Sequence, residues 1–271
     1  MVKDGTVSGD MYGDRDYKDK VTFDKTISVS PGRYYLEEFF AQRPGINADV
    51  LTAYSDADAT AVANTTITTA MTVANKSFEI LGTSASTDDV TFDATNAGLL
   101  LTTDGADNDQ IIILPHLNTN QTAWTGIKWG TENQVIWEGS IKTGASIATA
   151  LIWAGLKLTN TPTVATDDDQ VFFRYSTDDS DTTWQVESSI AGTGTSTSTS
   201  VTVAVDTTYR FRIEIDSERK ALCYINDVLV YKTAALTNDV DLIPYIGLQS
   251  LSAAADTLIV NYEKISRMLF E

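Results

Sequence analysis

Three carboxylates alternate along one segment of the chain, at Glu214, Asp216 and Glu218. Retaining hydrolysis of a glycosidic bond uses two carboxyl groups about 5 to 5.5 Å apart, and alternate residues of an unbroken strand provide that spacing. Here Ser217 begins a charged turn, because Glu218 is followed at once by two basic residues and then by a new strand-like segment. A turn carries Glu218 away from Glu214. We therefore expect no catalytic pair here and predict that the protein is not an enzyme.

Other residues that could do chemistry are isolated or irregularly spaced. The only histidine, His116, follows a proline, and no nucleophile elbow accompanies it as a Ser-His-Asp triad would need. The only cysteine, Cys223, excludes an internal disulfide and reads as a small buried hydrophobic residue. We predict no cofactor and no metal site, because none of the aspartate clusters has the spacing of a known calcium loop, although a structural calcium ion remains the alternative. These clusters are Asp104, Asp107 and Asp109; Asp167, Asp168 and Asp169; and Asp178, Asp179 and Asp181.

Short strands dominate the chain from Asp88 onward. The clearest spans residues 209–216, where Tyr209, Phe211, Ile213 and Ile215 face inward and the charged residues between them face outward. A turn then leads to strands at 221–225 and 228–231, joined by an Asn-Asp pair that can take φ > 0 at both positions. Many short strands without a helical period predict an all-β sandwich or jelly roll. The other expected strands lie at 135–141, 171–175, 184–190, 243–248 and 258–265.

A family resemblance follows from this C-terminal half. The stretch YRFRIEIDSERKALCYINDVLVYKT, followed by LIPYIGLQS and LIVNYEKI, resembles the concanavalin A-like lectin and laminin-G-like jelly rolls. The resemblance implies that residues 88–271 form such a domain, a fold that hosts lectins, glycanases, adhesion modules and virion proteins. Glu214 to Glu218 is also similar to the E-x-D-x-E signature of a glycanase family with this fold, which would imply Glu214 as nucleophile and Glu218 as acid. The tryptophans that usually flank that signature are missing nearby.

The N-terminal third differs from the rest of the chain in composition and sequence pattern. We predict an arm over residues 1–43, extended at first, with a strand at 21–29 and a short helix at 33–43 that begins after a Pro-Gly turn. Residues 44–87 are rich in Thr and Ala and read as a linker or a small β subdomain, with short strands at 66–72 and 77–81. The expected organisation is thus arm, linker or subdomain, and jelly roll.

Two sets of aromatic residues are candidates for binding. Trp124 and Trp129 could stack on sugars, whereas Trp137, Trp153 and Trp184 are expected in the core. The second set is expected to form an interface with other subunits, and the alternative is that its helical face of Tyr35, Phe39 and Phe40 packs against the chain's own sandwich. This set comprises Tyr12, Tyr17, Phe23, Tyr34, Tyr35, Phe39 and Phe40.

The charge balance limits the partners. The 271 residues carry a net charge of −18, which repels phosphate backbones and predicts no direct nucleic-acid binding. No stretch approaches the roughly 20 apolar residues of a membrane span, so we expect no membrane contact. The N-terminus lacks the apolar run of a secretory signal, which predicts synthesis in a cytoplasm.

The composition and predicted organisation of the whole chain resemble those of structural proteins of tailed bacteriophages. It combines a chain rich in Thr, Ala and Asp, little Cys or His, an N-terminal arm and a terminal jelly roll. This resemblance implies a virion protein that decorates and cements the head. Its implied partners are the major capsid protein and sister subunits, with which it would form a homotrimer. The alternative is a tail-associated or receptor-binding protein that recognises host glycans. We expect one of these two roles.

Overall fold

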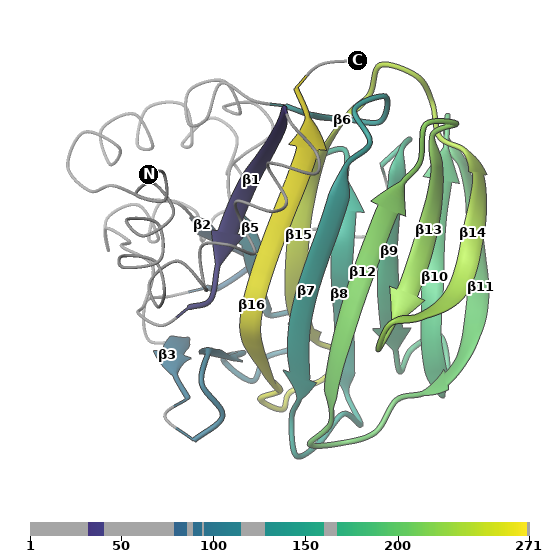
Figure 1. Cartoon of the computed structure of the whole chain (residues 1–271). Coiled ribbons are helices and arrows are strands. Elements are labelled where there is room, and N and C mark those ends of the chain that lie inside the picture. Colours follow the sequence, from purple (N-terminus) through teal and green to yellow (C-terminus); the bar gives the residue numbers. More distant parts are fainter. Residues whose placement is uncertain are drawn as a thin grey trace, which may run out of the picture.

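The computed structural model describes residues 32–40, 79–85, 89–93, 95–114, 128–159 and 167–269. These residues form two antiparallel β-sheets that face each other (Figure 1). Helices are absent from the described residues, so none is found there with the length and apolarity to cross a membrane. The expectation of an all-β sandwich is confirmed for this part of the chain.

The first sheet, sheet A, has the order β14-β13-β12-β7-β16-β4-β3. An eighth strand, β1, pairs antiparallel with the second half of β16, beyond the stretch of β16 that pairs with β4. The strands of sheet A are β1 (Arg33–Glu38), β3 (Val90–Phe92), β4 (Leu99–Thr102), β7 (Ile136–Thr143), β12 (Thr208–Ile215), β13 (Lys220–Ile225), β14 (Val228–Ala235) and β16 (Thr257–Met268).

The second sheet, sheet B, has the order β11-β10-β9-β8-β15-β5-β2, and the short strand β6 also pairs with β15. Its strands are β2 (Glu79–Leu81), β5 (Gln110–Leu114), β6 (Trp129–Gly130), β8 (Ala150–Lys157), β9 (Gln170–Ser176), β10 (Thr183–Ile190), β11 (Thr193–Thr202) and β15 (Asp241–Ser250).

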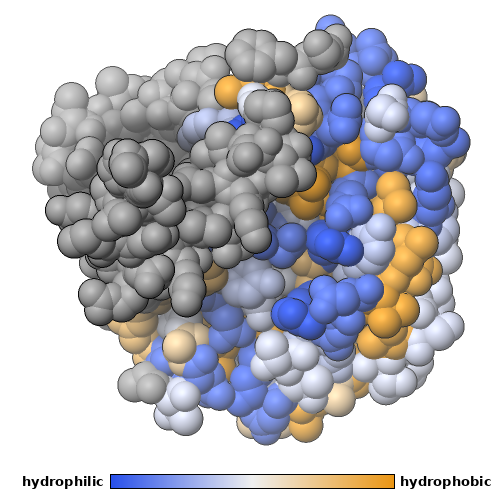
Figure 2. All heavy atoms as spheres, viewed as in Figure 1, coloured by the Kyte–Doolittle hydropathy of each residue, from blue (hydrophilic) through white to orange (hydrophobic). Residues whose placement is uncertain are grey.

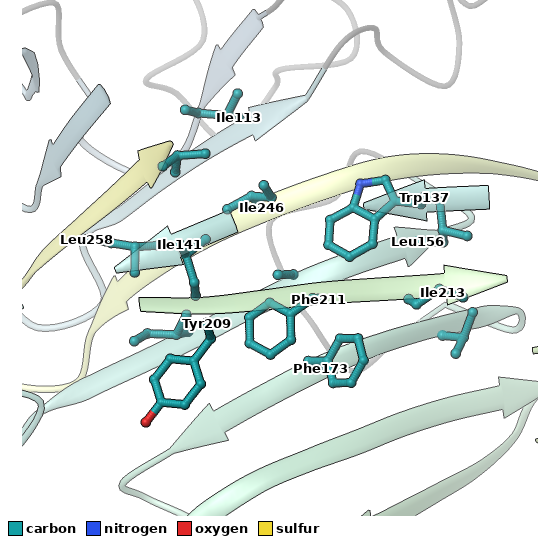
Figure 3. Close-up of a cluster of buried hydrophobic side chains, with 14 of the residues drawn as sticks. Ile113, Trp137, Ile141, Leu156, Phe173, Tyr209, Phe211, Ile213, Ile246 and Leu258 are labelled. Carbon is teal, nitrogen blue, oxygen red and sulfur yellow. The ribbon is translucent and has the colours of Figure 1, made fainter. Parts of the chain in front are cut away.

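The core lies between the two sheets and is rich in aromatic rings. Phe211 of sheet A stacks on Phe173 of sheet B with ring centroids 4.5 Å apart, and the two rings lie side by side in Figure 3. Trp184 meets Tyr209 and Phe211 edge-on, at 5.2 and 4.8 Å. Such offset and edge-on contacts are the favoured geometries for aromatic pairs. The rings therefore link the facing sheets at their centre.

The alternation predicted for residues 209–216 is confirmed. Tyr209, Phe211, Ile213 and Ile215 are buried, whereas the residues between them are exposed or half-buried. The turn after β13 is also confirmed, since Asn226 and Asp227 have φ values of 50° and 67°. The sequence pattern thus predicted both the register of β12 and the hairpin that follows β13.

The helix predicted over residues 33–43 is wrong for residues 33–38, which form strand β1. Tyr34 and Leu36 pack against the core while Glu37 is exposed, which is the two-residue alternation of a strand. The spacing of the aromatic residues in this segment had also fitted a helix. The backbone of β1 pairs with β16 over six residues, so a tertiary partner overrides the local helical pattern. Residues 41–43 lie outside the described residues.

Of the three other strands expected in the N-terminal third, one lies within the described residues. The short strand expected at 77–81 is present as β2, which pairs with β5, whereas the strands expected at 21–29 and 66–72 lie outside the described residues. Segments from both N-terminal regions thus contribute strands to the sandwich. The ten-residue strand β11 was not predicted, because its Ser and Thr residues show no alternation of apolar and polar side chains.

Candidate binding groove

The carboxylates of the Glu214 segment do not form a catalytic pair. Strand β12 ends at Ile215, and Asp216 accepts hydrogen bonds from the backbone N–H of Glu218 (2.8 Å) and of Lys220 (2.9 Å), which closes the expected turn. Glu218 is paired with the Lys220 ammonium at 2.5 Å, and this contact lowers the pKa of Glu218. A general acid needs a raised pKa, so Glu218 is not suited to that role.

The aromatic candidates are placed differently from one another. Trp129 is fully buried, with its ring 5.9 Å from that of Tyr34, so it offers no face on which a sugar could stack. Phe40 is buried in the core cluster, as the packing alternative expected, while Phe39 is 58% exposed with its ring 5.9 Å from Tyr262. Tyr35 lies in β1, half-buried. The remaining candidates, together with His116, lie outside the described residues, and they are Tyr12, Tyr17, Phe23 and Trp124.

The aspartate clusters serve the protein's own loops. Asp109 accepts the backbone N–H of Ala106 at 2.8 Å, and Asp181 accepts that of Ser176 at 2.9 Å. Among the residues that the structure describes, no group of three or more His, Cys, Asp or Glu side chains is arranged to hold a metal ion. Cys223 is buried, and burial raises the pKa of its thiol, so it behaves as the inert core residue expected.

A groove of about 470 Å³ opens on the face of sheet B that points away from sheet A. Strand pairing explains its floor: Glu187 of β10 lies opposite Phe172 of β9 and Ser196 of β11, so the three side chains share one face of the sheet. Most lining residues are polar, and they come from these three strands, from Leu151 of β8 and from the loops at the strand ends. The lining comprises Leu151, Asp167, Asp168, Gln170, Phe172, Arg174, Asp179, Glu187, Ser188, Ser189, Gly192, Gly194, Thr195 and Ser196.

Among the described residues that line the groove, Arg174 is the only cation, and acidic groups hold it in place. Its Nη1 lies 3.0 Å from Asp179 and 3.2 Å from Glu187, and its Nη2 lies 3.3 Å from Asp181. Burial raises the pKa of Asp181 and of Glu187, and in both cases the charge of Arg174 acts against that rise. The guanidinium is therefore fixed in one orientation, and its charge is already compensated from within the protein.

Three polar atoms in this groove are buried without a hydrogen-bond partner within the described part of the chain. They are Gln170 Oε1, Arg174 Nε and Glu187 Oε1, the last of which approaches Arg174 without the alignment of a hydrogen bond. Buried polar atoms in native proteins are nearly always paired with protein, water or ligand. This concentration in one groove marks a place where hydrogen-bonding groups of a ligand or of water are expected.

One end of the groove is braced by Asp167. Its carboxylate accepts hydrogen bonds from the backbone N–H of Thr159 (2.8 Å) and from its hydroxyl (2.7 Å), which joins the end of β8 to the start of β9. Lys157 Nζ lies 3.9 Å from Asp167 and 4.7 Å from the centre of the Tyr245 ring. Burial lowers the pKa of Lys157 to about 8, against the opposing effect of Asp167. These contacts make the end wall rigid.

Sequence reasoning did not find this site. Arg174 lies in the strand expected at 171–175, but its acidic partners are on other segments. A charged residue inside an otherwise apolar strand was the available signal. The partners of Arg174 became visible only with the pairing of β9 and β10.

Comparison with known proteins adds information on the fold. No family model and no curated protein matches the chain. A solved structure of a protein of unknown function from Shewanella oneidensis MR-1 is similar over 94% of this chain and 96% of that one, with 12% identity and a TM-score of 0.56. The alginate lyase A1-II′, of polysaccharide lyase family 7, is similar over 69% and 86%, with 11% identity and a TM-score of 0.50. A β-glucanase from Bacillus licheniformis is similar over 66% and 83%, with 12% identity and a TM-score of 0.46. What this chain shares with the first two is the β-sandwich fold.

Proposed function

We propose that this chain is a binding protein and that the groove on the outer face of sheet B holds a segment of a neutral glycan. The observation that carries the proposal is a concave site lined by Gln170, Arg174 and Glu187. Each of these has a buried polar atom without a hydrogen-bond partner among the described residues, and that of Glu187 is in ion-pair contact with Arg174. A concave site with a few convergent, immobilised polar groups is the usual form of a small-ligand site. Hydroxyl groups of a sugar can both donate to and accept from such atoms.

The charge of the groove selects against acidic sugars. Asp167, Asp168, Asp179 and Glu187 line it, whereas Arg174 is the one cation there and is already paired. A carboxylated or sulfated sugar would meet this local excess of negative charge in addition to the net charge of −18. A neutral sugar meets neither penalty. The fold likeness to a polysaccharide lyase is compatible with this proposal but is not its basis.

The described residues that line the groove include no exposed aromatic ring on which a sugar could stack, and this limits the expected affinity. Phe172 forms part of the floor but is only 1% exposed, so stacking on a sugar ring contributes little. Recognition then depends on hydrogen bonds, each with a modest net contribution of about 1 kcal/mol. We expect weak binding to one site and a dependence on sugar stereochemistry.

Replacing Gln170 by alanine tests the proposal. The change removes the buried amide oxygen at the floor of the groove, and we expect affinity for the bound oligosaccharide to fall about tenfold, the equivalent of one or two lost hydrogen bonds. The measurement is a titration calorimetry series with neutral gluco-, manno- and galacto-oligosaccharides, beside oligouronates of the same length. The matched control is Gln185→Ala, since Gln185 bonds to Thr183 of its own strand and does not line the groove.

Binding of oligouronates in preference to neutral sugars would contradict the proposal. The absence of binding to every neutral sugar would contradict it too. An equal loss of affinity in Gln170→Ala and Gln185→Ala would place the sugar outside the groove.

A second candidate is the role of a structural protein on a virus particle, attached to the capsid and to sister subunits. Exposed apolar side chains favour it, because Phe39 is 58%, Val228 64% and Leu229 50% exposed, and such groups often anchor interfaces. Figure 2 shows hydrophobic surface over the side of the sandwich where β14 lies.

Phe39→Glu tests the second candidate. Phe39 packs only on the surface, so we expect the variant to fold but to attach to capsids stripped of the native protein with greatly reduced occupancy. Occupancy is measured by sedimentation of the particles with added protein, with Phe92→Glu as the control, since Phe92 is exposed on the short strand β3. Failure of the wild-type protein itself to attach would remove this candidate.

A further inference from the structure

The outer strands of the two sheets differ in how they are protected from pairing with other chains. Strand β1, beside β16, carries the charged residues Arg33, Glu37 and Glu38, and β6, beside β15, is two residues long. The outermost strands β3 and β2 are only three residues long. Strand β14 pairs irregularly with β13 at two points and carries Lys232, which is bound to Asp216. Short strands, irregular pairing and lysines are common protections of a sheet edge. Strand β11, by contrast, is ten residues long and belongs to a run, residues 188–205, without a charged side chain or a proline.

The first half of β11 is a regular and accessible strand. Thr193 to Ser198 pair with β10 in unbroken register, and the irregularity comes only afterwards, near Ser200 with its φ of 63°. Five of these six residues are exposed, and Thr197 is half-buried. Regular backbone with open N–H and C=O groups along one side is a template for one more strand.

We propose that Thr193 to Ser198 form the interface of a homodimer, in which the β11 strands of two copies pair antiparallel about a two-fold axis perpendicular to sheet B. A two-fold interface requires a segment complementary to itself, and small uncharged Ser, Thr and Gly side chains meet this requirement without like charges facing each other. The uncharged edge of β11 contrasts with the net charge of −18 of the whole chain. This contrast identifies a second copy as the occupant of the edge.

The neighbouring edge of sheet A adds apolar surface to the same contact. Strands β11 and β14 lie at the same side of the sandwich, one behind the other in Figure 1. Strand β14, which carries the exposed Val228 and Leu229, therefore lies at the same side of the sandwich as the proposed interface. A six-residue strand edge with a few apolar side chains is a small interface, so the dimer is expected to form in a concentration-dependent way.

The dimer has a consequence for the groove, and this step rests on the proposed function. Gly194, Thr195 and Ser196 line the groove, which therefore reaches the edge of the sheet. A two-fold axis perpendicular to the sheet keeps both outer faces on the same side, so the two grooves adjoin across the axis. A glycan chain longer than one groove then contacts both copies, and the second contact raises its apparent affinity. The ligand class becomes an extended neutral polysaccharide.

The double variant Thr193→Lys/Ser198→Lys tests the dimer by sedimentation equilibrium of the full chain without any saccharide. The wild type is expected to pass from 29.5 kDa to twice that mass as its concentration is raised. The variant is expected to remain monomeric, because the two lysines of each copy would lie along the shared edge and bring like charges into it. The control Thr91→Lys/Thr95→Lys has the same charge change at the far edge of sheet A and is expected to dimerise as the wild type does. Circular dichroism checks that each variant is folded.

Three results would overturn the dimer proposal. They are a wild type that stays monomeric at every concentration, a wild type that reaches three times the monomer mass, and a folded β11 variant that dimerises as well as the control. Neither substituted residue lines the groove, so the monomeric variant should bind a short neutral oligosaccharide with unchanged affinity. The two proposals therefore fail separately: loss of the dimer leaves sugar binding in place, and absence of sugar binding leaves the dimer in place.

Discussion

Phe211→Ala is expected to lower the free energy of unfolding by about 3 to 5 kcal/mol, the range for removal of a buried phenylalanine side chain. The Phe211 ring is 1% exposed and contacts Phe173 of the facing sheet as well as Trp184. Its loss leaves a cavity between the sheets that backbone pairing prevents from closing. Urea unfolding followed by tryptophan fluorescence measures the change.

The adjacent Arg212→Ala provides the control on the same strand. Arg212 lies on the outer face, 3.2 Å from Glu214 and 4.1 Å above the ring of Tyr224, contacts that are partly exposed and expected to contribute about 1 kcal/mol or less. Equal losses in the two variants would contradict the register of β12, because a slip by one residue exchanges the two faces of a strand.

Glu263→Gln is expected to remove a large part of the pH dependence of stability. Glu263 is fully buried, and burial raises the pKa of its carboxyl from 4.5 to about 8, while the hydrogen bond from Trp137 Nε1 to Oε1 (2.8 Å) acts in the opposite direction. Its second oxygen has no hydrogen-bond partner among the described residues. The carboxyl is therefore protonated in the folded protein at neutral pH.

The direction of the pH effect follows from proton binding. Between pH 4.5 and about 8 the folded protein holds a proton on Glu263 that the unfolded chain has released, so rising pH favours unfolding. The stability contributed by this group is complete below pH 4.5 and is lost as pH rises through about 8, a total of about 5 kcal/mol. Glutamine keeps the acceptor for Trp137 but does not titrate.

Urea unfolding at a series of pH values from 5 to 9 checks this expectation. The wild type should lose stability steadily as pH rises, and Glu263→Gln should lose much less, so that the variant becomes the more stable protein at alkaline pH even if its unpaired amide costs about 1 to 3 kcal/mol at acidic pH. Glu214→Gln makes the same chemical change at a partly exposed site on the outer face of sheet A and serves as the control. Identical slopes in all three proteins would show that Glu263 is not the titrating group.

The chain's own periodicity determined the strands of the C-terminal half. Alternation from Tyr209 to Ile215 specified which side chains enter the core, and Asn226 and Asp227 specified the hairpin turn, because both features depend on residues that are neighbours in sequence. The break after Ile215, which separates Glu214 from Glu218, was predictable for the same reason. Burial of Cys223 followed from its place in a strand.

Tertiary structure alone decided the features that depend on distant partners. Residues 33–38 have a pattern compatible with helix or strand, and pairing with β16 selects the strand. Strand β11 has no apolar alternation and exists because β10 supplies its backbone partners. The groove brings Gln170, Arg174 and Glu187 together from two paired strands, and the raised pKa of Glu263 comes from burial between sheets. The physical reason is common to all of them: local sequence sets which face a side chain takes, whereas burial, pairing and electrostatic environment depend on segments far away in the chain.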